Sequence, residues 1–150
     1  MKYTIAIGSD HAGFDVKEII VKALNSGNLE EFNAGVSDMG PDSSDRVDYP
    51  DYAHKVAQSV AEGSCDLGIL ICGSGNGVCI TANKHDGIRA GLAWDTELAS
   101  LAREHNNANI ICLPARFVSE EKALEIAKAF LAASFEGGRH QERVQKIEQK

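Results

Sequence analysis

Short apolar segments alternate along this chain with longer amphipathic ones, and this alternation limits the folds open to it. Leu67–Cys72 is the most apolar segment, and residues 3–8 are rich in β-branched side chains before they end at a glycine. Both are typical of strands in a parallel sheet that is buried on both faces. Residues 16–24 instead place apolar side chains at helical spacing. Alternation of this kind predicts an α/β fold, a Rossmann-like doubly wound sheet of about five parallel strands flanked by helices.

The same pattern assigns the remaining elements. Further strands are expected at residues 29–33, 88–94 and 110–113, and helices at 52–61, 78–84, 97–104 and 120–135. Residues 34–49 read as a loop with a Gly-Pro turn signal, whose aspartates are expected to form a solvated surface. No repeat or linker divides residues 1–150, so we expect a single domain.

Charge and cysteine usage exclude several classes of protein. The chain carries 15 Lys and Arg against 22 Asp and Glu, a formal net charge of −7. This balance argues against nucleic acid and anionic membranes as partners. The first residues resemble no signal peptide and no stretch is long enough for a membrane span, so we expect a cytoplasmic protein. The four cysteines form no C-x-x-C pair and are expected to be reduced thiols, with Cys65, Cys79 and Cys112 serving packing.

Unusual residues follow the predicted strands, where ligands bind in doubly wound sheets. Asp10 and His11 follow the first strand, and the glycine-rich residues 73–77 follow Cys72. Three glycines in five residues allow backbone N–H groups to converge at a helix start, which suits a phosphate, a carboxylate or an oxyanion. The turn matches neither the dinucleotide fingerprint nor the P-loop. A plain structural turn is the alternative.

Cys72 ends the third strand beside this turn. A free cysteine is usually a small buried apolar residue, but a thiol next to a helix N-terminus tends toward the thiolate, a nucleophile or base. A tyrosine-phosphatase loop would need an arginine where this chain has Val78. Asp10 could be a capping residue, and His105 a charge complement at the end of a helix. Their joint placement with Cys72 around one cleft would favour catalysis.

The C-terminal segment is basic in an acidic chain. Arg139 and Arg143 are four residues apart, so they share one helix face with His140 nearby, an arrangement that suits a phosphate clamp. A solvated tail is the alternative. The tail is polar, with Val144 and Ile147 as its main apolar residues, and this suggests docking on a partner subunit.

Taken together, these residues resemble type B ribose-5-phosphate isomerases, in the family that also holds the galactose-6-phosphate and allose-6-phosphate isomerases. The resemblance runs from residue 5 to the C-terminus in family order. The matching pieces are residues 8–14, 48–50, 71–77, 82–84, 103–106 and 136–140. The resemblance implies interconversion of D-ribose 5-phosphate and D-ribulose 5-phosphate through an enediolate, without a metal or other cofactor, in the pentose phosphate pathway.

The resemblance also implies roles for individual residues. Cys72 matches the base that moves the proton between C1 and C2, and Val78 stands where other members carry a glutamate. His105 matches the acid that opens the furanose ring, with Asp10 taking part. The matches to the anion hole are Gly73, Ser74, Gly75, Asn76 and Gly77; those to the phosphate and sugar site are His11, Tyr49, Asn106, Arg116, Arg139 and Arg143. The family forms homodimers or dimers of dimers whose C-terminal segment crosses to the partner, so active sites are shared between chains.

One departure from the family pattern and several rival interpretations remain at this point. Pro114 precedes Ala115 and Arg116 where a glycine is usual before Ala-Arg, and proline restricts the aim of Arg116. Galactose 6-phosphate and allose 6-phosphate are alternative substrates. A non-catalytic phosphosugar- or nucleotide-binding module, a Cys72-based hydrolase and a metal site of Asp10, His11 and His105 are rivals of other classes.

Overall fold

A computed structural model describes residues 3–26 and 35–148. Strands and helices alternate along the described chain. The strands are β1 (Thr4–Ser9), β2 (Gly35–Asp38), β3 (Leu67–Cys72), β4 (Ala90–Leu92) and β5 (Ile110–Pro114). The helices are α1 (Phe14–Asn25), α2 (Tyr49–Ala61), α3 (Asn76–Ala82), α4 (Thr96–Glu104), α5 (Glu120–Ala132) and α6 (Arg139–Ile147).

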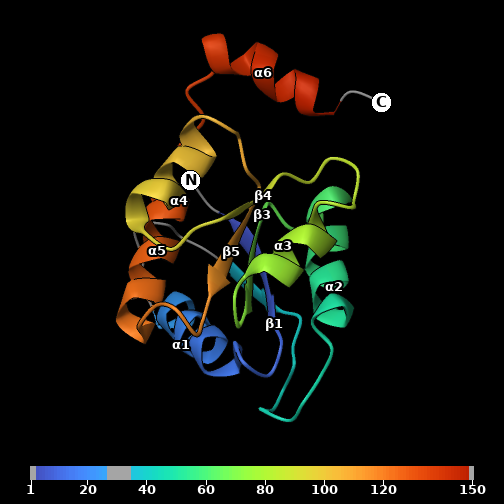
Figure 1. Cartoon of the computed structure of the whole chain (residues 1–150), viewed down its shortest axis with the longest axis vertical. Coiled ribbons are helices and arrows are strands. Elements are labelled where there is room, and N and C mark those ends of the chain that lie inside the picture. Colours follow the sequence, from blue (N-terminus) through green and yellow to red (C-terminus); the bar gives the residue numbers. More distant parts are fainter. Residues whose placement is uncertain (1–2, 27–34, 149–150) are drawn as a thin grey trace.

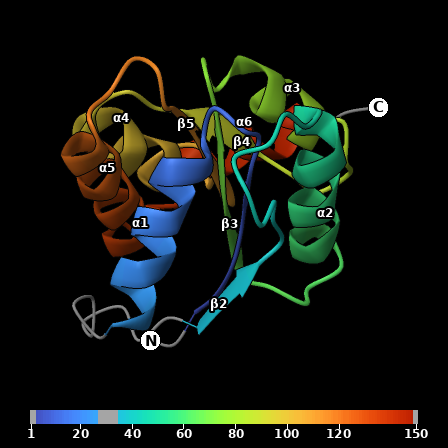
Figure 2. The ribbon, with the colours of Figure 1, turned by 90° about the horizontal axis from the view of Figure 1, so that it is seen from below.

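All strand pairs of the sheet are parallel, and the strand order is β2-β1-β3-β5-β4. Helices α1, α4 and α5 cover one face, and α2 and α3 cover the other (Figure 2). Helix α6 lies apart from both layers, beyond one end of the sheet (Figure 1). The predicted doubly wound α/β fold is therefore confirmed.

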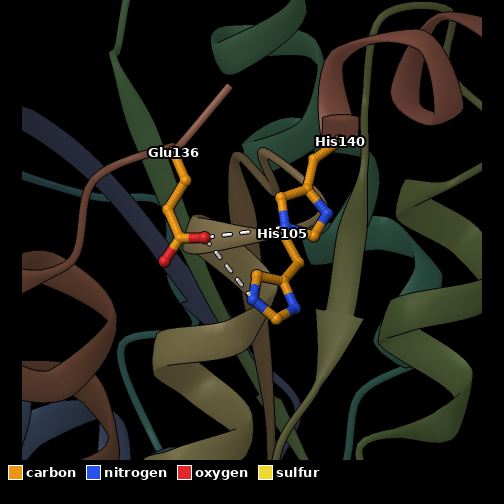
Figure 3. A group of neighbouring side chains, drawn as sticks. All are labelled: His105, Glu136 and His140. Atoms are coloured by element: carbon orange, nitrogen blue, oxygen red, sulfur yellow. Dashed lines mark ion pairs between the residues drawn. The ribbon is translucent and has the colours of Figure 1, made fainter. Parts of the chain in front are cut away.

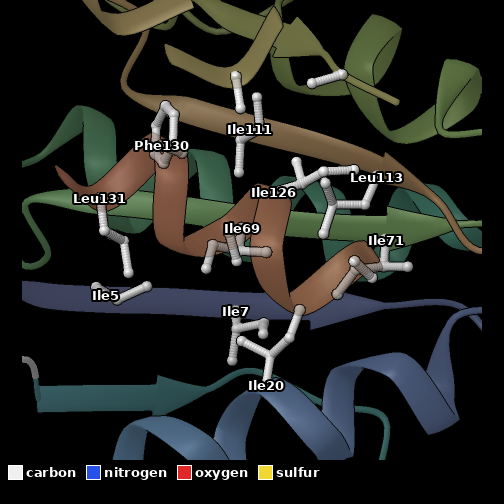
Figure 4. Close-up of a cluster of buried hydrophobic side chains, with 14 of the residues drawn as sticks. Ile5, Ile7, Ile20, Ile69, Ile71, Ile111, Leu113, Ile126, Phe130 and Leu131 are labelled. Atoms are coloured by element: carbon white, nitrogen blue, oxygen red, sulfur yellow. The ribbon is translucent and has the colours of Figure 1, made fainter. Parts of the chain in front are cut away.

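Alternation along the three central strands builds a separate core on each face. In β3, Ile69 and Ile71 face α1, α4 and α5, whereas Leu70 and Cys72 face α2 and α3. Ile5, Ile7, Ile111 and Leu113 join the first core with side chains from α1 and α5 (Figure 4). Burial on both faces explains why β3 is apolar throughout, the signal that predicted it.

The prediction that residues 34–49 form a loop is wrong for the first part of this segment. Gly35–Asp38 forms β2, which pairs with β1 from Thr4↔Gly35 to Ile7↔Asp38. This edge strand is half-exposed and lacks an apolar run, so its sequence carries no strand signal. The strand predicted at residues 29–33 lies outside the described residues.

Other boundaries differ because of local backbone conformation. Helix α3 begins at Asn76, two residues early, because Gly75 adopts φ 77° and caps it. Helix α5 ends at Ala132 rather than 135, where Ala133 turns extended. The edge strand β4 keeps only three residues. The tail is helical, with Val144 buried and Ile147 57% exposed in the single chain.

Among the loop aspartates, Asp38 is exposed as predicted, but its carboxylate also pairs with a buried lysine. Its carboxylate oxygens lie 2.8 and 3.0 Å from Nζ of Lys17, a fully buried lysine of α1 that also contacts Glu18. Burial alone would lower the pKa of Lys17, but hydrogen bonds to Asp38 and Glu18 outweigh it and raise the pKa. The ion pair ties α1 to the edge strand.

We expect Asp38→Ala to lower the free energy of unfolding by about 3 kcal/mol, because it leaves the buried Lys17 charge with one exposed partner. Lys17→Met should cost less than about 1 kcal/mol, since an apolar chain of similar length fills the space and Asp38 is open to water. Urea denaturation of both variants measures this difference, and equal losses would contradict it.

None of the helices in the described part of the chain has the length and apolar content of a membrane span. Its cysteines Cys65, Cys72, Cys79 and Cys112 are free thiols. Cys65 and Cys112 are buried in the core, as predicted, whereas Cys79 is half-buried and its sulfur contacts the Ala90 carbonyl.

Candidate active site

The sheet has a switch point between β1 and β3, and the candidate site lies at their carboxyl ends. The chain leaves β1 toward α1 on one face and leaves β3 toward α3 on the other (Figure 2), and ligands of doubly wound sheets bind in the crevice at such a point. Asp10 follows β1, and its N–H donates to the Ile71 carbonyl at 3.2 Å. Cys72 is the last residue of β3. The topology therefore brings Asp10 and Cys72 together, as the sequence predicts.

A cavity of about 460 Å³ occupies this crevice. Its lining comes from the ends of β1 and β3, from the start of α2 and from the loop after β5. The lining residues are Asp10, Tyr49, Cys72, Gly73, Ser74, Gly77, Arg116 and Phe117. All except Phe117 were candidates from the sequence. The volume suits a small polar molecule.

The glycine turn is folded around the Cys72 thiol. The Gly75 N–H donates to Sγ of Cys72 at 3.2 Å, and the Asn76 N–H donates to Oγ of Ser74 at 3.2 Å. Gly75 needs its positive φ, and a Cβ there would lie 2.5 Å from a Leu92 methyl group. Cys72 is 4% exposed, so its sulfur sits at the floor of the cavity with an amide donor already directed at it. Asn76 faces an adjoining cavity.

Asp10 is held by the start of α1. The Gly13 N–H donates to Oδ1 of Asp10 at 3.0 Å, and Asp10 is 8% exposed. A Cβ on Gly13 would lie 2.7 Å from the Ile71 carbonyl oxygen, so only glycine lets α1 begin this close to β3. The carboxylate is thereby fixed beside the β3 terminus. The neighbouring His11 places Nδ1 3.2 Å from the Val47 carbonyl oxygen.

Tyr49 and Arg116 form opposite walls. The Tyr49 ring packs on Gly77 so closely that a Cβ there would lie 2.5 Å from it. The Arg116 N–H donates to the Gly73 carbonyl at 3.0 Å, and its side chain lies against Gly73. Pro114 therefore does not turn Arg116 away from the cavity. The Ala115 N–H bonds the Cys72 carbonyl at 2.9 Å and continues the β3–β5 pairing past the proline.

His105 lies at the end of the sheet where the parallel strands begin (the amino edge), whereas Cys72 lies where they end (the carboxyl edge). The prediction that His105 and Cys72 share one cleft is therefore wrong within one chain. His105 caps the end of α4, ahead of β5, whereas Cys72 pairs with Pro114 at the end of β5. Five residues of strand at about 3.3 Å each separate the two edges by about 15 Å. The predicted elements carried a signal for this separation, because a residue between the end of a helix and the start of the next parallel strand lies where the strands begin.

His105 belongs to a cluster at this amino edge. Glu136 places Oε1 3.7 Å from Nε2 of His105 and 3.6 Å from Nε2 of His140, and the two imidazole rings stack with centroids 4.2 Å apart (Figure 3). Burial lowers the pKa of His140, and the neighbouring His105 and Arg139 charges lower it further.

The other predicted residues of this edge lie near the cluster. Asn106 lines a second cavity of about 470 Å³, together with Arg89 and Ile147. Arg139 and Arg143 stand exposed on α6, whose end is tied to the body by an ion pair of 3.2 Å between Arg89 and Glu148. The candidates thus divide into a Cys72 group at the carboxyl edge and a His105 group at the amino edge.

Within the described chain, His105, Glu136 and His140 are the one group of three side chains close enough to share a metal ion. Their two rings are only 15° from parallel, and a nitrogen lone pair lies in its ring plane. One ring would have to turn before both could point at one ion. The rival metal site of Asp10, His11 and His105 is not assembled in one chain.

Two residues of these groups were missed from the sequence. Phe117 is 75% exposed at the rim of the Cys72 cavity, and an aromatic residue just after a strand-end arginine was its only signal. Glu136 falls within a piece that matches the family, but no role was predicted for it. Its position before two glycines was the available signal, since that turn folds it back toward His105.

Comparison with known proteins identifies the relatives of this chain. It matches the Ribose/Galactose Isomerase family over residues 5–147. It is 48% identical to ribose-5-phosphate isomerase B of Escherichia coli over 143 residues, covering 95% of this chain and 93% of that protein.

The chain belongs to the ribose/galactose isomerase family.

Solved structures of this family share its fold. The type B ribose 5-phosphate isomerase of Trypanosoma brucei superposes with a TM-score of 0.91 at 44% identity, covering 99% of this chain and 98% of that one. Ribose-5-phosphate isomerase B of Mycoplasma genitalium, solved with bound ribulose-5-phosphate, superposes with a TM-score of 0.88 at 46% identity, covering 97% of this chain and 93% of that one. The resemblance stated from the sequence is confirmed, and the chain is an enzyme, a sugar-phosphate isomerase.

Proposed function

We propose that this isomerase interconverts D-ribose 5-phosphate and D-ribulose 5-phosphate through an enediolate. The observation that carries the proposal is the Cys72 thiol at the switch point, with the Gly75 N–H on its sulfur and Asp10 in the same cavity. Family membership adds the class of substrate, and the relative from Mycoplasma genitalium binds the proposed product.

In the proposed reaction, His105 protonates the ring oxygen of the furanose while the hydroxyl on C1 passes its proton to water, which opens the ring to the aldehyde. Cys72, as thiolate, then removes the proton from C2, and the electron pair moves onto the aldehyde oxygen. The proton of the C2 hydroxyl then moves to the C1 oxygen, and return of the proton from Cys72 to C1 gives the ketose. Each step conserves protons and needs no oxidant or metal.

The residues around Cys72 suit the charge that develops. The glycine turn lies at the start of α3 beside Cys72, and we propose that its N–H groups other than those of Gly75 and Asn76, which donate to Cys72 and Ser74, stabilise the enediolate oxygen together with the Ser74 hydroxyl. One such donor is typically worth about 3 kcal/mol in the transition state. Asp10 and Tyr49 would bind the sugar hydroxyls on the opposite wall, and His11 and Arg116 the phosphate.

We propose further that each active site is built from two copies of the chain. The base and the ring-opening acid lie at opposite edges of the sheet, about 15 Å apart, which is too far for one five-carbon substrate. A homodimer, or a dimer of dimers, that sets α6 and His105 of one copy over the Cys72 cavity of another would complete the site. Arg139 and Arg143 would then join Arg116 around the phosphate.

Proton exchange in D₂O tests the reaction directly. Chelator-treated protein is mixed with ribose 5-phosphate, and NMR follows the C2 proton and the appearance of ribulose 5-phosphate. We expect conversion with deuterium entering the sugar. If neither product nor exchange is seen, ribose 5-phosphate is rejected as the substrate, and allose 6-phosphate and galactose 6-phosphate are tested next.

We expect Arg139→Ala to raise KM about tenfold or more while kcat falls less than about threefold, because the phosphate is remote from the reacting carbons and its clamp contributes uniform binding. Steady-state kinetics with ribose 5-phosphate measures both constants. Lys146→Ala, an exposed cation of the same helix, is the matched control and should change neither. An unchanged KM in Arg139→Ala would mean that α6 does not contribute to phosphate binding.

A further inference from the structure

Two imidazole side chains of the amino edge converge on one carboxylate oxygen. Oε1 of Glu136 lies 3.7 Å from Nε2 of His105 and 3.6 Å from Nε2 of His140. The side chains come from the end of α4, the α5–α6 connection and the first turn of α6 (Figure 3). The proposed reaction uses His105 alone, so the roles of Glu136 and His140 remain to be explained.

The backbone is shaped to produce this convergence. The Glu136 N–H donates to the Glu104 carbonyl at 3.0 Å, which fixes Glu136 beside the residue that precedes His105. Gly137 and Gly138 then adopt φ 69° and 54°, and a Cβ at either position would meet nothing within 4 Å. Conformation rather than space requires glycine here, and the resulting turn carries His140 back over the His105 ring.

Charge distinguishes the two histidines. Burial and the neighbouring His105, Arg139 and Arg143 lower the pKa of His140, and together they outweigh the Glu136 carboxylate, which raises it. The side chain of His140 is 10% exposed and that of His105 is 38% exposed, so His105 is the histidine that a substrate can reach. A neutral His140 ring stacks on His105 without charge repulsion, and the Glu136 carboxylate contacts His105 at Nε2.

We infer that Glu136 is a positioning residue for the ring-opening acid, holding the His105 ring in a fixed orientation while His140 packs against it. The inference rests on the proposed function, since it assigns the acid to His105. A carboxylate that contacts an imidazole fixes the orientation of the ring; in metal-bound histidines, loss of such a partner costs about 10- to 100-fold, and we expect an effect of similar size here.

Two reactions of the same enzyme distinguish a role of Glu136 in ring opening from a role in catalysis or folding as a whole. Ribose 5-phosphate is a furanose that must open, whereas ribulose 5-phosphate is an open-chain ketose because its C5 oxygen carries the phosphate. Exchange of the ketose C1 proton with D₂O therefore needs the base and the anion hole but not the ring-opening acid. A defect confined to ring opening slows isomerisation and spares this exchange.

For Glu136→Gln we expect isomerisation of ribose 5-phosphate to fall about 10- to 50-fold, with C1 exchange of ribulose 5-phosphate within about twofold of the parent protein. His105→Ala should show the same split with a larger loss. Glu136→Asp, which keeps the charge, should recover part of the activity. Glu142→Gln removes an exposed carboxylate from the same segment and should change neither reaction.

Each other outcome overturns the inference. Equal losses of isomerisation and exchange in Glu136→Gln would mean that Glu136 supports the fold or the dimer rather than the acid. No loss in either reaction would remove it from the mechanism. If the unmodified protein catalyses neither reaction, the proposed function itself fails, and this result is distinct from failure of the Glu136 variant alone.

Discussion

Cys72→Ala is expected to abolish isomerisation, with activity reduced about 10³-fold or more. The thiol is the proposed base for the C2 proton, and the cavity lining includes no other cysteine that could replace it. The fold should survive, because alanine loses only a sulfur from a position at the cavity floor. Turnover of ribose 5-phosphate measures the effect, and retention of more than a few per cent of activity would remove Cys72 as the base.

Cys79→Ala is the matched control for this variant. Cys79 is a half-buried thiol of α3 and does not line the Cys72 cavity. Its removal should leave turnover close to that of the parent protein. Calorimetric binding of ribose 5-phosphate to Cys72→Ala checks that the phosphate site is intact, since loss of binding along with turnover would point to a collapsed cavity.

Mixing two inactive variants should restore activity. If each site takes Cys72 from one chain and His105 from another, a dimer of a Cys72→Ala chain and a His105→Ala chain has one site with both groups intact. At equal amounts, random exchange makes half of the dimers mixed, and about a quarter of the parent activity should return. A site within one chain would regain none.

The control mixes two variants whose substitutions lie at the same end of the sheet. Cys72→Ala and Asp10→Asn both alter the cavity at the carboxyl ends of β1 and β3, so a mixed dimer holds no intact site. The subunits are exchanged by partial denaturation and refolding, and turnover is measured before and after. Recovery in this control pair, or none in the first pair, would contradict the two-chain site.

Much of the fold was predictable because buried parallel strands have a strong sequence signal. Leu67–Cys72 was assigned at its observed bounds, since both of its faces are covered by helices and every residue is apolar. The edge strand β2 was not, because a half-exposed strand of four residues needs no apolar run. The buried Lys17 was also missed: its Asp38 partner is 21 residues away, and only the β1–β2 pairing brings it to α1.

The chain's residue types alone determined the chemistry available to it. A thiol beside a glycine turn, a carboxylate after the first strand, and histidines and arginines near the C-terminus are all readable in the sequence, and they resemble one isomerase family. The tertiary structure decided which of these groups act together in one chain. Parallel strands put Asp10 and Cys72 at one edge of the sheet, and the helices that return between them put His105 and α6 at the other. The physical reason is that sequence order gives no distances, whereas the direction of each strand and helix sets which edge its end reaches.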